Sequence, residues 1–233
     1  MFNFVMKIMT MIKFMVISSI AIIIFGIILS SWGIDDISGL LAHPARVALL
    51  SLLIAQFIVM FFFISPKWMF HSGILSNTCQ VKENCLIGYL GIMAVILFLI
   101  ISPFSDRKAW MLLAGGDFFR YLGVMLFILG NILIFWKAIH ISKKVLEFGN
   151  LAKNQLITDG PFKYIRHPYY VGLIMICISI PLVFVSSLGL LLALFASTAL
   201  LEQIAREERI LMRHYKEEWL DYIKKTKRLI PRF

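Results

Sequence analysis

Four long apolar stretches follow one another in this chain, and they limit what it can fold into. They run from Phe14 to Ile34, from Val47 to Ser65, from Cys85 to Ser102 and from Tyr121 to Trp136. A helix of about 20 mostly apolar residues crosses the hydrocarbon core of a bilayer, so each stretch is a candidate transmembrane helix. Hydrophobic residues form 60% of the chain and charged residues 15%, against about 45–50% and 25% in soluble domains. The sequence therefore predicts an integral membrane protein and argues against a cytosolic enzyme.

A fifth apolar stretch, Tyr169–Leu201, is too long for one ordinary span and too short for two complete ones. Pro181 disfavours a continuous helix, and Ser186–Gly189 has the composition of a turn. We therefore expect two abutting helices, at about residues 170–185 and 188–205. They would form a tight hairpin that leaves the membrane on the side where it entered. A single tilted and kinked helix is the alternative.

The distribution of positive charge favours the hairpin. Lys and Arg outnumber Asp and Glu by 23 to 13, and basic residues prefer the cytoplasmic side of a membrane. With a cytoplasmic N-terminus and a returning hairpin, only four basic residues fall in outer loops: Arg46, Arg107, Lys108 and Arg120. A last helix that did not return would place every basic residue from Arg206 onward outside. Both termini are therefore predicted to be cytoplasmic. The net charge of +10 needs no nucleic-acid partner, because anionic lipid attracts the same residues.

The predicted fold is all-α and membrane-embedded, with four transmembrane helices, the C-terminal hairpin and a cytoplasmic C-terminal helix. No metal site is expected, because the five histidines are scattered along the chain. They lack the i, i+3 or i, i+4 spacing with which a helix presents metal ligands. The three cysteines fall near a predicted inner loop or in the hairpin, so we expect reduced thiols.

Two predicted cytoplasmic segments, 137–170 and 202–233, carry most of the polar residues and would face each other across the hairpin. The first contains Thr158–Gly172, in which a turn, a cation, an imidazole and three tyrosines precede or begin the hairpin. Ionisable residues at the edge of a membrane bundle suggest function. The alternative is an ordinary membrane interface, in which Pro168 only begins a helix while Tyr and Arg side chains reach the headgroups.

The second segment contains Glu207 and Glu208, on a helix expected to run to about His214. Adjacent side chains point about 100° apart around a helix, so one carboxylate could face a site while the other pairs with a cation. The alternative is ordinary surface charge, supported by Glu202 and Arg206 at i, i+4.

Several motifs in these segments resemble one known superfamily in their order and spacing. They are Gly160–Gly172 (GPFKYIRHPYYVG), Glu207–Leu211 about 35 residues later, Tyr215–Tyr222 and the closing Ile230–Pro231. Together they are similar to the isoprenylcysteine carboxyl methyltransferase and phospholipid methyltransferase superfamily. The resemblance covers Thr158–Pro231, about a third of the chain.

The resemblance implies an integral-membrane enzyme that uses S-adenosylmethionine, with its active site at the cytoplasmic face. It implies Arg166 and Glu208 as catalytic residues. The implied cofactor-binding residues are Tyr164, His167, Pro168, Tyr169, Tyr170, Gly172, Glu207 and Glu208. Residues 85–233 would form the methyltransferase core, with the motifs in 158–231. Residues 1–84 would form an N-terminal transmembrane pair and inner loop without assigned function.

The residue types suit this cofactor, which carries a sulfonium, an amino-acid head group and a ribose diol. Glu207 and Glu208 could accept hydrogen bonds from the ribose or the ammonium group, and Arg166 and His167 could donate to the carboxylate. The tyrosines could stack on the adenine or form hydrogen bonds. Methyl transfer is an in-line displacement that depends on positioning and needs no metal.

Two departures from the superfamily leave the methyl acceptor open. His214–Lys216 stands where the prenylcysteine enzymes usually have a Phe-Gly pair, and Gly130–Ile132 lacks the Gly-x-Gly of the phospholipid enzymes. A prenylcysteine carboxylate, a lipid amine and a small thiol are all candidate acceptors, and each is a lipid-associated or small apolar molecule. A sterol-reductase-like membrane enzyme that uses NADPH is the alternative function. Gly160–Pro161 and the double acid favour methyl transfer.

Overall fold

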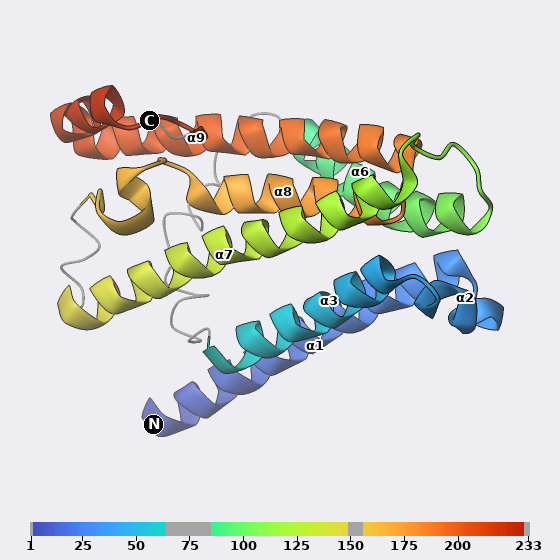
Figure 1. The fold of residues 1–233 in the computed structure, drawn as a ribbon. Coiled ribbons are helices and arrows are strands. Elements are labelled where there is room, and N and C mark those ends of the chain that lie inside the picture. Colours follow the sequence, from blue (N-terminus) through green and yellow to red (C-terminus); the bar gives the residue numbers. More distant parts are fainter. Residues whose placement is uncertain (1, 64–84, 149–155, 231–233) are drawn as a thin grey trace.

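The computed structural model describes residues 2–63, 85–148 and 156–230, and within these ranges the chain is helical with no β-strand (Figure 1). The helices in chain order are α1 (Phe2–Trp32), η1 (Ile34–Asp36), α2 (Ile37–Leu41), α3 (Pro44–Phe63), α6 (Cys85–Arg107), α7 (Gly116–Phe148), η4 (Gly160–Lys163), α8 (Pro168–Val183) and α9 (Ser187–Lys225). The predicted all-α class is confirmed for this part of the chain.

Three of these helices, α6, α7 and α9, are long and apolar enough to cross a membrane. A fourth candidate is the bent pair Ile17–Trp32 and Ile34–Leu41, whose axes differ by 83°. Shorter apolar helices occupy Pro44–Val59 and Pro168–Val183. The protein is thus an integral membrane protein by the length and composition of its helices, while the number of four spans before the hairpin stays a prediction.

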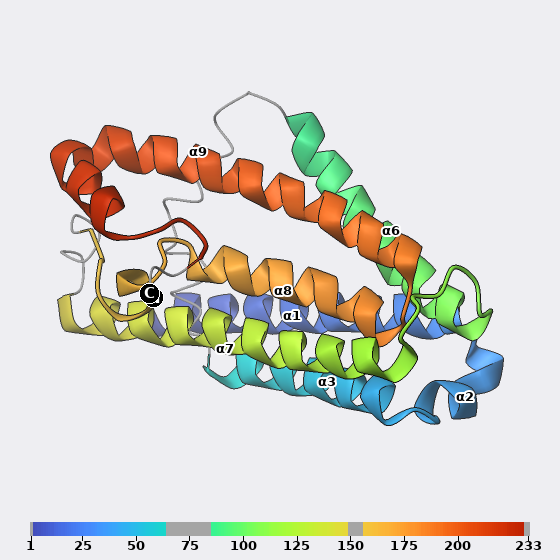
Figure 2. The same ribbon diagram turned by 45° about the horizontal axis from the view of Figure 1, so that its top comes forward.

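The last apolar stretch divides between α8 and α9. α8 ends at Val183, and Ser186 caps α9 by accepting a hydrogen bond from the Gly189 amide at 3.0 Å. Between them Val185 has a left-handed backbone, with φ of 44°. Figures 1 and 2 both show α9 running back beside α8. Pro181 lies inside the last turn of α8 and does not itself break the helix. That both ends of this pair lie at the cytoplasmic face stays a prediction.

α9 is longer than the predicted second arm of the hairpin. It continues from the apolar residues through Glu207 and Glu208 without a break until Lys216, where φ is 44° and ψ is −109°. After Lys216 the chain turns and a further helical stretch runs to Lys225. The two glutamates therefore belong to the same helix as the apolar arm, which fixes their position relative to α8.

α7 also exceeds the apolar stretch that predicted it. The stretch ends at Trp136, whereas the helix runs to Phe148. Hydropathy marks only the part of a helix that suits lipid, and polar helix formers extend it beyond that point. The extension carries His140 and Lys144 to the loop before α8, as described below.

α7 and α8 pack closely because glycines line their contact. Gly130 of α7 and Gly172 of α8 face each other. A Cβ added to Gly130 would lie 2.7 Å from the carbonyl oxygen of Gly172, and one added to Gly172 would lie 2.6 Å from that of Gly130. Gly123 contacts the backbone of Ser179 in the same way. α8 thus begins from a position fixed by α7.

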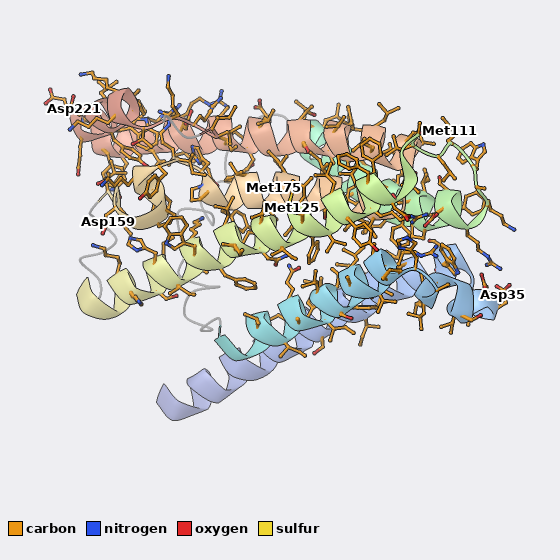
Figure 3. The ribbon with its side chains drawn as sticks, viewed as in Figure 1. Asp35, Met111, Met125, Asp159, Met175 and Asp221 are labelled. Carbon is orange, nitrogen blue, oxygen red and sulfur yellow. The ribbon has the colours of Figure 1, made fainter. Side chains whose placement is uncertain are left out.

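One end of the bundle holds a buried ionic cluster. The Asp106 carboxylate pairs with Arg46 at 3.1 Å and with Arg120 at 2.6 Å, and its side chain is 4% exposed. Arg120 also donates to the carbonyl of Val183 at 2.8 Å. Figure 3 labels Asp35 at this end of the molecule and Asp159 and Asp221 at the other. The polar motifs of the sequence therefore lie at the end opposite this cluster.

Candidate active site

The loop before α8 is fastened to the end of α7. Asp159 pairs with Lys144 at 2.9 Å and with His140 at 3.1 Å. The Lys144 ammonium, with a smaller effect from His140, holds the pKa of Asp159 below its ordinary value. Gly160 has a φ of 61°, and a Cβ there would lie 2.5 Å from the His140 ring. The Asp-Gly-Pro turn therefore needs its glycine both for backbone conformation and for space.

Glu208 contacts two arginines and one histidine, which come from two segments of the chain. Its Oε1 lies 3.1 Å from Nε2 of His167 and 3.5 Å from Nε of Arg166. Its Oε2 lies 2.6 Å from Nη2 of Arg228. The His167 side chain is 6% exposed and that of Glu208 19%, whereas Arg228 is 42% exposed, so the cluster is buried on the His167 side and open to solvent on the Arg228 side. The structure thus brings Glu208 together with Arg166 and with His167, which lies 41 residues before it in sequence.

Glu207 lies in a different environment, beside aromatic rings. Its Oε1 accepts a hydrogen bond from the Tyr170 hydroxyl. The Tyr170 ring lies 5.5 Å from the Tyr169 ring, and the Lys137 ammonium lies 4.7 Å above the Tyr169 ring. The charge of Lys137 also interacts with that of Glu207. The two adjacent carboxylates therefore diverge around α9, one toward arginines and one toward tyrosines.

Three other predicted site residues lie outside these contacts. Pro168 is the first residue of α8 and is buried, in the position where a proline suits a helix. Gly172 serves the contact between α7 and α8. Tyr164 is 55% exposed, and its ring lies 6.0 Å from that of Trp136. A role for these three in cofactor binding stays a prediction.

The C-terminal residues form a wall beside the loop that carries Arg166, and none of them was predicted to be a site residue, although Trp219 and Tyr222 belong to one of the quoted motifs. The Tyr222 hydroxyl donates to the carbonyl of Phe162 at 2.7 Å, and the Arg166 guanidinium lies 5.9 Å from the Trp219 ring. Trp219 and Tyr222 are buried. Buried aromatics within a polar helix are the signal that could have revealed this wall. Arg228 and Lys137 carried no signal beyond their charge.

The matched family covers most of this site. The family model for phospholipid methyltransferase matches residues 118–218, which include α8, both glutamates and all but the first two residues of α7. Trp219, Tyr222 and Arg228 lie beyond the match. No curated protein shows a significant match to the chain. Residues 118–218 thus match the model of the phospholipid methyltransferase family, which lies within the superfamily of integral-membrane methyltransferases that the sequence motifs resemble.

Proposed function

We propose that this protein is an S-adenosylmethionine-dependent methyltransferase that acts on a lipid-associated or small apolar acceptor at the cytoplasmic membrane face. The observation that carries the proposal is the convergence of Arg166, His167 and Glu208 at one end of an apolar helical bundle. These residues lie inside the range that matches the methyltransferase family. The cytoplasmic position is supported by the basic residues that surround this end in sequence.

The charges of the site suit the head group of S-adenosylmethionine. Arg166 and Arg228 share the single carboxylate of Glu208, so the two guanidinium charges outnumber the carboxylate that they share. Nε of Arg166 lies 3.5 Å from Glu208, and the buried Nε of Arg228 has no hydrogen-bond partner among the described residues. An anionic carboxylate is the ligand that such leftover guanidinium donors favour.

The remaining parts of the cofactor have matching groups nearby. Glu207 is the carboxylate that is not held by arginines, so we assign to it the ammonium group or the ribose hydroxyls. The rings of Tyr169, Tyr170 and Trp219 provide apolar surface for the adenine. Tyr170 in turn holds Glu207 by its hydroxyl, which fixes the carboxylate that the ligand would meet.

The site residues are proposed to bind and orient the reactants, because methyl transfer requires little acid–base catalysis by the protein. When bound, S-adenosylmethionine supplies an electrophilic methyl group that an acceptor lone pair displaces from sulfur. Arg166 and Glu208 hold and orient the cofactor, which restricts it to in-line approach by the acceptor. The aromatic wall around Trp219 and Tyr222 excludes water from this end of the bundle.

The acceptor is proposed to arrive from the lipid. The site lies where α8 begins, and the helices that lead to it each contain a long apolar part. A lipid amine, a prenylcysteine carboxylate or a small apolar thiol could approach along them while the cofactor enters from the water. Photolabelling with a bilayer-resident acceptor analogue should mark α8 or α9, and labelling confined to residues 108–115 would contradict this route.

Binding measurements test the function directly. The detergent-solubilised protein is titrated with S-adenosylhomocysteine and, separately, with NADPH. We expect binding of S-adenosylhomocysteine only. NADPH binding without S-adenosylhomocysteine binding would replace the proposal with the reductase alternative. Transfer of tritiated methyl to lipid extract, prenylcysteine analogues and small thiols, assayed in parallel, then identifies the acceptor.

A further inference from the structure

The chain folds back onto the candidate site after α9. α9 ends at Lys225, and Thr226 is extended and buried. The Arg166 amide donates to the carbonyl of Lys227 at 2.9 Å, and the His167 amide donates to that of Arg228 at 3.3 Å. The C-terminal segment, Thr226–Ile230, is thus paired through its backbone with the loop that supplies Arg166 and His167.

The break at Lys216 makes this return possible. The left-handed residue redirects the end of α9, so that Trp219 and Tyr222 pack against the site loop. The Tyr222 hydroxyl reaches the carbonyl of Phe162, which lies in η4. Both the helix end and the segment after it are therefore held on the same loop. Arg228 reaches Glu208 from this position.

Glu208 lies between one arginine of the site loop and one of the C-terminal segment. Arg166 and His167 approach Oε1, and Arg228 approaches Oε2. Among the described residues, Glu208 is the carboxylate that pairs with both guanidinium cations, which would otherwise repel each other. The two guanidinium groups outnumber the carboxylate that they share, and the buried Nε atom of Arg228 makes no hydrogen bond among the described residues, so the pair has donors left for a second anion.

We propose that Arg228 is a cofactor-binding residue which, together with Arg166, binds the amino-acid carboxylate of S-adenosylmethionine and so fastens the C-terminal segment over the occupied site. The proposal rests on the function proposed above. A ligand that contacts both segments stabilises their docking in proportion to its occupancy. Cofactor binding and order of the C-terminal segment are therefore coupled.

Ligand binding by matched variants tests the role of the carboxylate. S-adenosylhomocysteine and its decarboxylated analogue are each titrated into the full-length protein and into Arg228→Gln. Arg228→Gln should weaken S-adenosylhomocysteine binding by about tenfold or more, since it removes a charge-assisted interaction. The decarboxylated analogue should bind both proteins alike. Lys225→Gln, which removes the same charge from an exposed residue, should change either affinity less than about twofold.

Arg228→Lys keeps the test valid if the glutamine variant does not fold. The lysine preserves the charge but lacks the guanidinium fork. It should therefore bind S-adenosylhomocysteine several-fold more weakly than the native protein and bind the decarboxylated analogue equally well. Thermal unfolding of each variant shows whether it is folded before titration.

Hydrogen exchange provides a readout independent of activity. S-adenosylhomocysteine should slow amide exchange in residues 226–230 of the native protein and not in Arg228→Gln. Three results would overturn the role of Arg228 without affecting the proposed function. They are equal affinity of both proteins for S-adenosylhomocysteine, an equal loss of affinity for both ligands in Arg228→Gln, and unchanged amide exchange in the native protein when S-adenosylhomocysteine binds. Failure of the native protein to bind S-adenosylhomocysteine would overturn the proposed function, and this inference with it.

Discussion

Glu207 and Glu208 are neighbours in sequence but meet different partners. Glu208 is held by Arg166, His167 and Arg228, whereas Glu207 accepts from Tyr170. A carboxylate between two arginines is needed to keep those cations together. A carboxylate beside a hydroxyl can exchange that bond for a ligand. The two acids are therefore not interchangeable.

Replacing Glu208 by alanine should abolish methyl transfer. The substitution leaves Arg166 and Arg228 next to each other without their shared counter-charge. Loss of charge-assisted hydrogen bonds of about 1.5–3 kcal/mol each corresponds to a rate loss of about a hundredfold or more. The measurement is tritium transfer with membrane preparations of equal protein content. Glu202→Ala, on the same helix but outside the cluster, is the control, and full activity of Glu208→Ala would reject the site.

Close packing of α7 and α8 is the main feature at the scale of single elements. Gly130 and Gly172 bring the two backbones together, which sets the start of α8 and hence the direction of His167 and Tyr170. The sequence motif that contains Gly172 also contains the site residues. A glycine at this position is therefore expected whether it contacts the cofactor or packs against α7. The structure favours packing, because the nearest atoms to Gly172 belong to α7.

Gly172→Ala separates the two roles. The added methyl meets the backbone of Gly130, and overpacking of this kind costs about 1–3 kcal/mol. We expect a lower melting temperature in detergent and an unchanged affinity of the folded protein for S-adenosylhomocysteine. Gly88→Ala is the matched control, because nothing lies within 4 Å of a Cβ there. A normal melting temperature combined with lost ligand affinity would instead support direct contact with the cofactor.

The whole molecule joins its N-terminal helices to α6 and α7 at the end opposite the candidate site. The joint is Asp106 of α6, between Arg46 of α3 and Arg120 of α7. Arg46 also lies 4.6 Å above the ring of Trp32, at the end of α1. Three helices from both parts of the chain therefore depend on one buried carboxylate. Its loss should loosen the bundle as a unit while the site chemistry is unchanged.

Asp106→Asn tests this dependence. It leaves two buried arginines without their shared counter-ion, and breaking a buried ion pair costs about 3–5 kcal/mol. The melting temperature should fall sharply, as measured by thermal unfolding in detergent. Asp221→Asn removes an exposed carboxylate that pairs with Lys224 and should have little effect. Equal melting temperatures for the two variants would show that the ionic cluster does not support the fold.

Much of the fold and part of the site followed from the sequence. Apolar stretches predicted the helical membrane class, because burying a backbone in lipid requires its hydrogen bonds to be internal. The resemblance to the methyltransferase superfamily implied that Arg166, His167 and Glu208 share one site, and turn composition predicted the break before α9. These are local or pairwise features, which the residue types themselves report.

Other features required the tertiary structure. The apolar stretch ended at Trp136, so hydropathy could not show that α7 extends further and that its Lys144 pairs with Asp159. In the sequence Arg228 is one of many basic residues. Only the structure shows that the C-terminal segment folds back and pairs Arg228 with Glu208. Nothing in the sequence distinguishes Gly172 and Gly130 from other glycines, and only the packing of α7 against α8 shows that they face each other. The sequence alone therefore determined which segments suit lipid and which residues could share a ligand. Which charges and glycines meet was decided only in the tertiary structure, because contacts between distant segments depend on how the helices pack.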